Sequence, residues 1–175
     1  MNQVNNVMDV LKVLEDIEYG YLDIDNKENR EIDKNFKKKY MLSSPEEVME
    51  NKLGICYDVV ELERALFKKL GMKFGTYFMI YYESSKKIFT HTFVVYEENE
   101  KFYWFEASWK KFTGIHEYMS LFDLLTSVRE NFQKFNNLKF MDLDYLCVYK
   151  YKKPKSHIGL KDFYKHCENG ENVMI

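Results

Sequence analysis

The chain of 175 residues contains only 7 glycines and 2 prolines, so long irregular loops are not expected and regular elements should dominate. It has no run of about 18 apolar residues, which argues against a helix that crosses a membrane. Residues 1–6 also lack the basic patch and apolar run of a secretory signal. We therefore expect a cytoplasmic protein with no membrane partner.

Charge of one sign is not in excess either, because 26 basic and 28 acidic residues give a formal charge of −2. No overall basic field is then present to hold nucleic acid. Short lysine runs at residues 37–39, 86–87, 110–111 and 152–153 are interleaved with acids and fit solvent-exposed faces. No nucleic-acid partner is expected.

Cysteine is scarce as well, with three residues in the chain. An odd number of thiols in a reducing compartment favours free cysteines over disulfides. The adjacent His166 and Cys167 have no Cys-x-x-Cys partner, and no P-loop, GxGxxG or EF-hand pattern occurs. We expect no metal and no cofactor, and each thiol is then either a small core residue or a nucleophile.

What the chain does have is the composition of a globular domain, with 46% hydrophobic, 17% aromatic and 31% charged residues. Its length suits one domain, which we expect to span residues 1–175. Apolar residues spaced by three and four predict a helix from residue 4 to about residue 19. Ser44 and Glu47 have the spacing of a capping box that begins a short second helix, and a third is expected over residues 56–70.

After the third helix the pattern changes to β-prone residues, which predict strands at residues 74–82, 88–96 and 101–107. The short connections between these strands predict a continuous antiparallel meander. A helix, a strand and a last helix are expected at residues 120–135, 141–151 and 160–168. Helices segregated from an antiparallel sheet are typical of the α+β class. We expect a core at about residues 40–151, with the N-terminal helix and a C-terminal tail at 152–175 as additions.

The segment Gly54-Ile55-Cys56-Tyr57-Asp58 carries a chemical signal, because it places a cysteine in the first turn of a predicted helix. The positive end of a helix favours the thiolate form of cysteine, and a glycine leaves room for a substrate beside the sulfur. Cys56 is therefore in a suitable position for a nucleophile, although a small buried residue also fits when it is taken alone.

A thiolate nucleophile needs a base, and the base needs an orienting group. His91 lies within the second predicted strand, and Glu106 is the only acid in the aromatic stretch that ends the third. A hairpin that closes at Glu98 and Asn99 places His91 and Glu106 opposite each other, with Cβ atoms about 4.5–5.5 Å apart. Taken singly, His91 also fits a core residue and Glu106 an exposed acid at a strand end.

Residues 43–118 resemble the transglutaminase-like superfamily of cysteine enzymes. The start of the third helix is similar to its nucleophile helix, and residues 91–96 and 103–109 look like its histidine and acid strands, in the same chain order. The resemblance implies a papain-like, transglutaminase-core fold with Cys56 as nucleophile, His91 as general base and acid, and Glu106 as orienting acid. The family usually has aspartate where Glu106 stands, and nothing in the chain resembles the calcium sites of the larger classical transglutaminases.

The same resemblance implies an oxyanion hole beside the nucleophile. The backbone N–H of Cys56 is one natural donor, and Tyr40 is the best-placed upstream side chain, with ordinary packing as the alternative. Tyr57 and Trp109 are further candidates to line the oxyanion or substrate site, and ordinary packing is again the alternative for Trp109.

Three functions remain open from the sequence. The first is cysteine-dependent acyl transfer on amide bonds through a thioester, which includes peptide or isopeptide hydrolysis, deamidation and transamidation. The second is a catalytically inactive module that binds a peptide or protein in the same cleft. The third is acyl transfer from a coenzyme A thioester, as in arylamine acetyltransferases, which have a similar triad order. The first two imply a peptide or protein partner.

Overall fold

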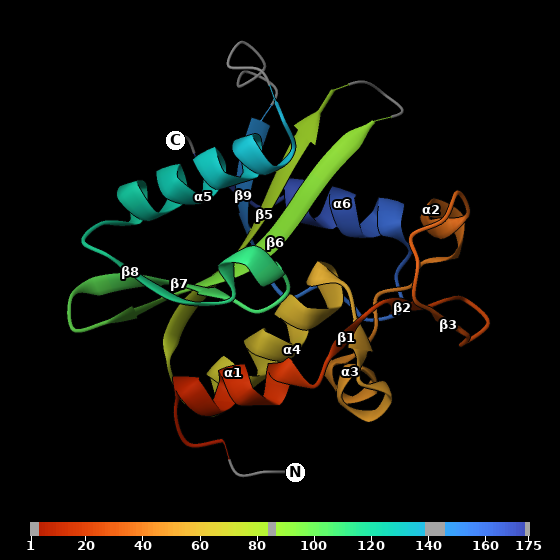
Figure 1. The fold of residues 1–175 in the computed structure, drawn as a ribbon, viewed down its shortest axis with the longest axis horizontal. Helices are drawn as coiled ribbons and strands as arrows, with labels where there is room; N and C mark the ends of the chain where they lie inside the picture. The colour runs from red at the N-terminus through yellow and green to blue at the C-terminus, as the bar shows by residue number, and fades with distance from the viewer. Residues whose placement is uncertain (1–3, 84–86, 139–145, 174–175) are drawn as a thin grey trace.

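The computed structural model describes residues 4–83, 87–138 and 146–173. Helices pack on both faces of an antiparallel sheet, as expected for the α+β class (Figure 1). Helices α1, α4 and α6 contribute to the core on one face, and α5 covers the other. The bounds are Val7–Glu15 for α1, Cys56–Lys69 for α4, Leu121–Phe135 for α5 and Leu160–Glu168 for α6. No helix in the described ranges is both long and apolar enough to cross a membrane.

The main sheet has six strands in the order β10-β9-β5-β6-β7-β8, and all neighbours are antiparallel. The strands are β5 (Lys73–Tyr82), β6 (Ile88–Glu98), β7 (Lys101–Glu106), β8 (Gly114–Tyr118), β9 (Leu146–Tyr151) and β10 (Glu171–Asn172). The meander of β5, β6 and β7 is confirmed. Strand β9 confirms the described part of the fourth predicted strand, whose residues 141–145 lie outside the described residues. Strands β8 and β10 are additions that the sequence pattern did not indicate.

Alternation along the central strand β5 divides the core between the two faces of the sheet. Tyr77 and Met79 belong to the cluster under α5, whereas Phe78 and Ile80 belong to the cluster under α4. All four side chains are buried. A strand covered on both faces is continuously apolar rather than alternating, as the sequence of β5 is.

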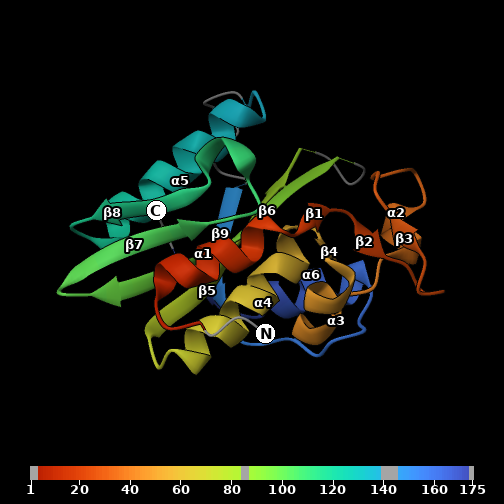
Figure 2. The same cartoon turned by 60° about the horizontal axis from the view of Figure 1, so that its bottom comes forward.

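The N-terminal part of the chain lies against the start of α4 (Figure 2). The first helix is shorter than predicted and ends at Glu15, because Glu18–Tyr19 form strand β1, which pairs in parallel with β4 (Leu53–Gly54). The capping box of Ser44 and Glu47 is confirmed at the start of α3. The remaining elements here are β2 (Tyr21–Leu22), β3 (Glu28–Asn29), α2 (Phe36–Lys39) and α3 (Pro45–Asn51).

The β6–β7 hairpin is offset by two residues from the predicted register. Glu98 pairs with Lys101, so the loop consists of Asn99 and Glu100 rather than Glu98 and Asn99. Asn99 and Glu100 have φ of 50° and 61°, the conformation of tight two-residue hairpin loops. A shift by two residues keeps every side chain on its face of the sheet. The expected cross-strand pair therefore becomes a diagonal one, and its two side chains still share a face.

Both ends of the chain contribute buried residues to the cluster around α4. Val10 and Leu14 come from α1, and Phe163 and Cys167 come from α6. The ring of Phe163 packs on that of Tyr57, with 4.9 Å between their centroids. The segments that the sequence marked as additions thus complete the packing around the start of α4.

Candidate active site

Cys56 is the first residue of α4 and directly follows β4 through Ile55. The Ile55 N–H donates to Asp58 Oδ2 at 3.0 Å, which closes the first turn of the helix. A Cβ added at Gly54 would lie 3.2 Å from Asp58 Cβ, so this close approach favours glycine. The turn leaves Cys56 partly exposed at the positive end of a 14-residue helix.

The buried carboxyl of Asp58 anchors this turn to the preceding chain. Its Oδ1 accepts from the Tyr40 hydroxyl at 2.9 Å and from the Ser43 N–H at 2.9 Å. Burial raises the pKa of Asp58 from 3.8 to about 7, and these hydrogen bonds act in the opposite direction. Asp58 therefore holds three buried donors in place beside the cysteine.

His91 lies on a part of β6 with which β7 does not pair, because the β6–β7 ladder ends at Val94 and Phe105. The start of α4 meets β6 at this end of the strand. Thr92 Oγ1 donates to the backbone oxygen of Cys56 at 2.7 Å. This hydrogen bond fixes the backbone of the candidate nucleophile next to the strand that carries the candidate base.

Glu106, at the end of β7, uses both of its oxygens. Oε2 lies 2.7 Å from Nε2 of His91, and Oε1 accepts from the N–H and hydroxyl of Ser108 at 3.0 Å each and from the Trp109 N–H at 2.7 Å. Glutamate in place of the usual aspartate thus reaches the imidazole while the turn after β7 holds its other oxygen. Nε2 is occupied by Glu106, so Nδ1 is the ring nitrogen available to the sulfur of Cys56.

The charges of this cluster favour a protonated imidazole. Burial disfavours the imidazolium, but the Glu106 carboxylate and a hydrogen bond with the Cys56 side chain outweigh it and raise the pKa of His91 from 6.5 to about 10. Burial also acts to raise the pKa of Glu106, and the charge and hydrogen bond of His91 reverse this, so that the pKa lies below 4.5. His91 and Glu106 are only 7% and 1% exposed, and water screens their interaction little.

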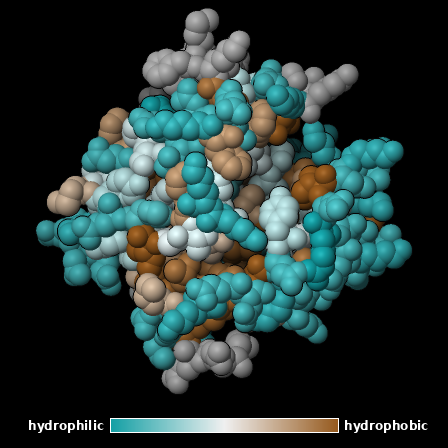
Figure 3. All heavy atoms as spheres, viewed as in Figure 1, coloured by the Kyte–Doolittle hydropathy of each residue, from teal (hydrophilic) through white to brown (hydrophobic). Residues whose placement is uncertain are grey.

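Cys56 and His91 line a cavity of about 310 Å³. Trp109 covers the imidazole edge-on, with 5.0 Å between ring centroids. Phe135, which is 57% exposed, and Tyr19, which is 52% exposed, stand at its rim. On the face seen in Figure 3, hydrophobic residues show between the hydrophilic ones that dominate the outline. The cavity combines a polar reactive end with aromatic walls, as small-molecule and peptide sites often do.

The structure does not bring Tyr40 and Tyr57 to this cavity, whereas Trp109 is one of its lining residues. Tyr40 is 1% exposed, and its hydroxyl donates to Asp58. Tyr57 is buried, and its hydroxyl contacts Thr90 Oγ1 and lies 2.9 Å from the Tyr164 hydroxyl. Both tyrosines therefore help to hold the first turn of α4 and do not reach the cavity.

Several residues of the site were not indicated by the sequence reasoning. Tyr19 reaches the cavity through the two-residue pairing of β1 with β4, which has no local sequence signal. Thr90 and Ser108, which also line the cavity, flank the candidate base and acid. Phe135 comes from the end of α5, beyond the residues expected to be buried.

Glu63 is a further carboxyl that the sequence reasoning missed. It is 1% exposed, and its Oε2 has no hydrogen-bond partner among the described residues. Burial, followed by the charge of Glu106, raises the pKa of Glu63 well above 4.5. Glu63 follows Cys56 by seven residues and lies within the apolar stripe of the helix. This spacing is the sequence signal that predicts a buried carboxyl on the same side as Cys56.

Nothing in the described part of the chain brings together three or more histidine, cysteine or acidic side chains in a way that could hold a metal ion. A family profile described as a transglutaminase-like domain matches residues 1–140. The chain belongs to this family. The match contains α4, β6 and β7, and therefore all of the elements that carry Cys56, His91 and Glu106. No curated protein matches the chain.

Membership of the transglutaminase-like family agrees with the fold predicted from residues 43–118. Strand β9 and helix α6 lie beyond the matched residues, yet β9 pairs with the central strand β5. In this transglutaminase-like domain the family core is thus completed by a C-terminal segment of the same chain.

Proposed function

We propose that this transglutaminase-like domain is a cysteine-dependent acyl-transfer enzyme that acts on amide bonds of a peptide or protein. Cys56 is the nucleophile, His91 the general base and acid, and Glu106 the group that orients His91. One observation carries the assignment: the His91 imidazole is hydrogen-bonded to the buried Glu106 carboxylate, and His91 and Cys56 line the same cavity, which is open to substrate.

Because the raised pKa of His91 favours the imidazolium at neutral pH, the reaction begins from the state in which the proton of the Cys56 thiol has already passed to Nδ1 of His91. The thiolate then attacks the carbonyl carbon of the amide, a C–S bond forms, and the carbonyl oxygen becomes an oxyanion. The first N–H groups of a helix have no acceptor within the helix, so the Cys56 N–H is available to this oxyanion. The positive helix end stabilises the same negative charge.

Collapse of the tetrahedral intermediate breaks the C–N bond and leaves a thioester on Cys56. The leaving amine takes its proton from the His91 imidazolium, which Glu106 stabilises in the charged form. Water or a second amine then attacks the thioester, His91 accepts the proton of that nucleophile, and the sulfur departs and is reprotonated. Hydrolysis, deamidation and transamidation share these steps and differ in the leaving and attacking groups.

The first test measures the reactivity of the cysteines with iodoacetamide at pH 7, followed by mass spectrometry. An ordinary thiol is only a few per cent ionised at this pH, so we expect Cys56 to react about tenfold faster than the partly exposed Cys147, which serves as the internal control. His91→Asn should remove the difference. Equal, slow labelling of Cys56 and Cys147 would point instead to a binding module.

The second test looks for the thioester itself. The full chain is incubated with a panel of peptide amides and quenched in acid, and its mass is measured by mass spectrometry. In a parallel sample, hydroxylamine is added to convert a thioester into a hydroxamate. We expect an acyl adduct on wild type and none on Cys56→Ala. An adduct formed only from acetyl-coenzyme A, or turnover that persists in Cys56→Ala, would contradict the proposed reaction.

A further inference from the structure

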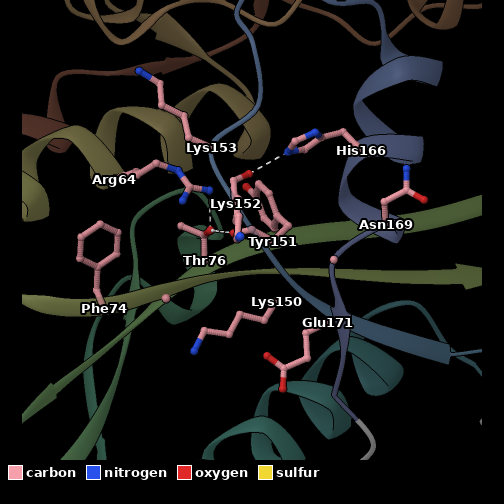
Figure 4. Close-up of a pocket in the computed structure, with 12 residues that line it drawn as sticks. Arg64, Phe74, Thr76, Lys150, Tyr151, Lys152, Lys153, His166, Asn169 and Glu171 are labelled. Carbon is pink, nitrogen blue, oxygen red and sulfur yellow. Dashed lines mark hydrogen bonds between the residues drawn. The ribbon is translucent and has the colours of Figure 1, made fainter.

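A second cavity, of about 570 Å³, lies outside the candidate active site and shares no lining residue with it. It forms where β9 stops pairing with β5: that ladder begins at Thr76 and Tyr151, and β5 continues beyond it through Phe74 and Gly75 (Figure 4). The turn after α6 closes the opposite side, through Gly170. The cavity is in the size range of sites for small molecules.

Positive charge is concentrated around this cavity, although the whole chain has a formal charge of −2. Its lining includes Arg64 and three exposed lysines, Lys150, Lys152 and Lys153, against a single acid, Glu171. None of these lysines makes an ion pair with a described residue. In Figure 4, Lys153 extends toward one side of the cavity and Lys150 toward the other. The charge is therefore spread along the cavity rather than gathered at one point.

Arg64 is held in place by its neighbours in this lining. Its Nε and Nη2 donate to the two oxygens of Glu61 at 2.8 and 3.2 Å, and Nη2 also donates to Thr76 Oγ1. The guanidinium lies over the ring of Tyr151, 5.0 Å from its centroid, and Tyr151 in turn donates to Glu61 at 3.1 Å. Nη1 has no partner among the described residues, so the N–H groups of this one nitrogen remain for a ligand.

The balance of charge around Arg64 favours an anion. The Glu61 carboxylate pairs with the positive charge of Arg64, and the charge of Lys153 also acts on Glu61. The lysines nevertheless outnumber Glu171, the only acid in the lining. Since Arg64 is already immobilised, with its side chain only 13% exposed, little further conformational entropy is lost when it binds a ligand.

Two glycines allow the chain to pack closely around Lys150 at this cavity. A Cβ added at Gly75 would lie 3.0 Å from Lys150 Cε, and one at Gly170 would lie 2.4 Å from the backbone oxygen of Lys150. Larger residues would therefore displace either the lysine or the strand that carries it. The space beside Gly75 is filled by the stem of Lys150 and the ring of Tyr77, so glycine at this position lets Lys150 lie along the strand at the cavity.

We propose that this cavity binds a small ligand that carries a chain of phosphate groups. The free Nη1 of Arg64 and the spread of the lysines match an anion whose charge extends over several groups, because each lysine acts on phosphate as a point charge and Nη1 donates from a fixed position. Phe74 lies at the same cavity and offers an aromatic surface to any organic group attached to the phosphates. The site is independent of the acyl-transfer chemistry at Cys56.

The experiment is isothermal titration of the full chain at low ionic strength with tripolyphosphate, ATP and a hexaglutamate peptide. We expect saturable binding of tripolyphosphate at one site per chain. Lys152→Gln/Lys153→Gln should weaken it at least about tenfold, since each charge-assisted contact contributes that much or more. The matched control Lys34→Gln/Lys38→Gln, which removes the same charge from exposed positions elsewhere, should change affinity by less than about twofold.

Two further variants separate the site from general electrostatics and from catalysis. Arg64→Lys keeps the charge but loses the fixed Nη1 donor, so weaker binding in a variant with an unchanged melting temperature supports the assigned geometry. Cys56→Ala should bind as wild type does. Tighter binding of ATP than of tripolyphosphate supports a nucleotide as the source of the phosphates, and the reverse order supports an inorganic chain.

Three results would overturn the assignment. They are no binding of tripolyphosphate by wild type, an equal loss of affinity in the two double lysine variants, and hexaglutamate binding as tight as that of tripolyphosphate. The last result would mark the cavity as a site for an acidic peptide.

Discussion

The substitution Glu106→Gln tests the pair of His91 and Glu106, because it removes the charge of the carboxylate and keeps the size of the side chain. The amide oxygen can still accept from the backbone N–H groups of Ser108 and Trp109, as Oε1 does now. The amide NH₂ then faces Nε2 of His91 and donates to it. This places the proton of the neutral imidazole on Nδ1, where it blocks transfer from the Cys56 thiol.

The size of the effect follows from the charge that is lost. With Glu106 present, the pKa of His91 is raised to about 10, against 6.5 for an ordinary histidine. This difference in pKa corresponds to roughly 4–5 kcal/mol of stabilisation of the imidazolium. Without the carboxylate, burial dominates and the pKa of His91 is expected to fall below 6.5. Because the folded protein binds this proton more tightly, the ion pair stabilises the fold fully below pH 6.5. That stability is lost as the pH rises through about 10.

The assay is an NMR pH titration of the protein with labelled histidine, with His91 assigned by comparison with His91→Gln. Wild-type His91 should remain protonated well above pH 8, whereas His91 in Glu106→Gln should be neutral at pH 7. Urea unfolding should show a stability loss of about 3–5 kcal/mol near pH 6, and the loss should shrink toward pH 10. Turnover should fall by about 10³–10⁴, as expected when the base is held in the wrong tautomer.

Glu117→Gln is the matched control, because Glu117 is an exposed carboxylate on the neighbouring strand β8 that pairs with Lys101. It should leave the titration of His91 unchanged. A wild-type His91 that titrates near pH 6.5, or the same midpoint in wild type and in Glu106→Gln, would refute the electrostatic reasoning.

Two other substitutions test how Cys56, the proposed nucleophile, is positioned. Thr92→Val removes the hydrogen bond to the Cys56 backbone at nearly constant volume, so we expect a stability loss of about 1 kcal/mol and a fall in kcat of about tenfold at unchanged KM; an unchanged kcat would mean that this contact does not position Cys56. Asp58→Ala leaves three buried donors without an acceptor. It should lower the free energy of unfolding in guanidinium by about 3–5 kcal/mol, against about 1 kcal/mol for Tyr40→Phe, which removes one of these donors. Equal losses would contradict the anchoring role of Asp58.

The elements with strong local patterns were predictable from the sequence. Helix α4 has an apolar stripe, α5 begins at the capping residue Ser120, and β5, β6 and β7 are separated by short polar turns. The sequence predicted that His91 and Glu106 lie opposite each other, and the register was wrong by two residues. The two side chains still interact, because alternation keeps both on the same face of the sheet. A glutamate in a left-handed loop conformation has no propensity signal, so the position of the Asn99–Glu100 loop was not predictable.

The parts that were missed depend on contacts between distant segments. Strand β1 has two residues, and only its pairing with β4 brings Tyr19 to the cavity. Tyr40 precedes Cys56 at a distance along the chain that fits an oxyanion donor, but the sequence gives no sign that its hydroxyl turns toward Asp58. The cavity at Arg64 combines β5, β9 and the turn after α6, which no local pattern joins.

The packing around Tyr57 has a consequence for how the protein is made. Tyr57 directly follows Cys56, and it is covered by Phe163 and Tyr164 from near the far end of the chain. A ribosome synthesises the helix that begins at Cys56 well before these covering residues exist. A nascent chain that has stalled ahead of Leu160 therefore carries the partly exposed Cys56 beside an aromatic ring that Phe163 and Tyr164 do not yet cover.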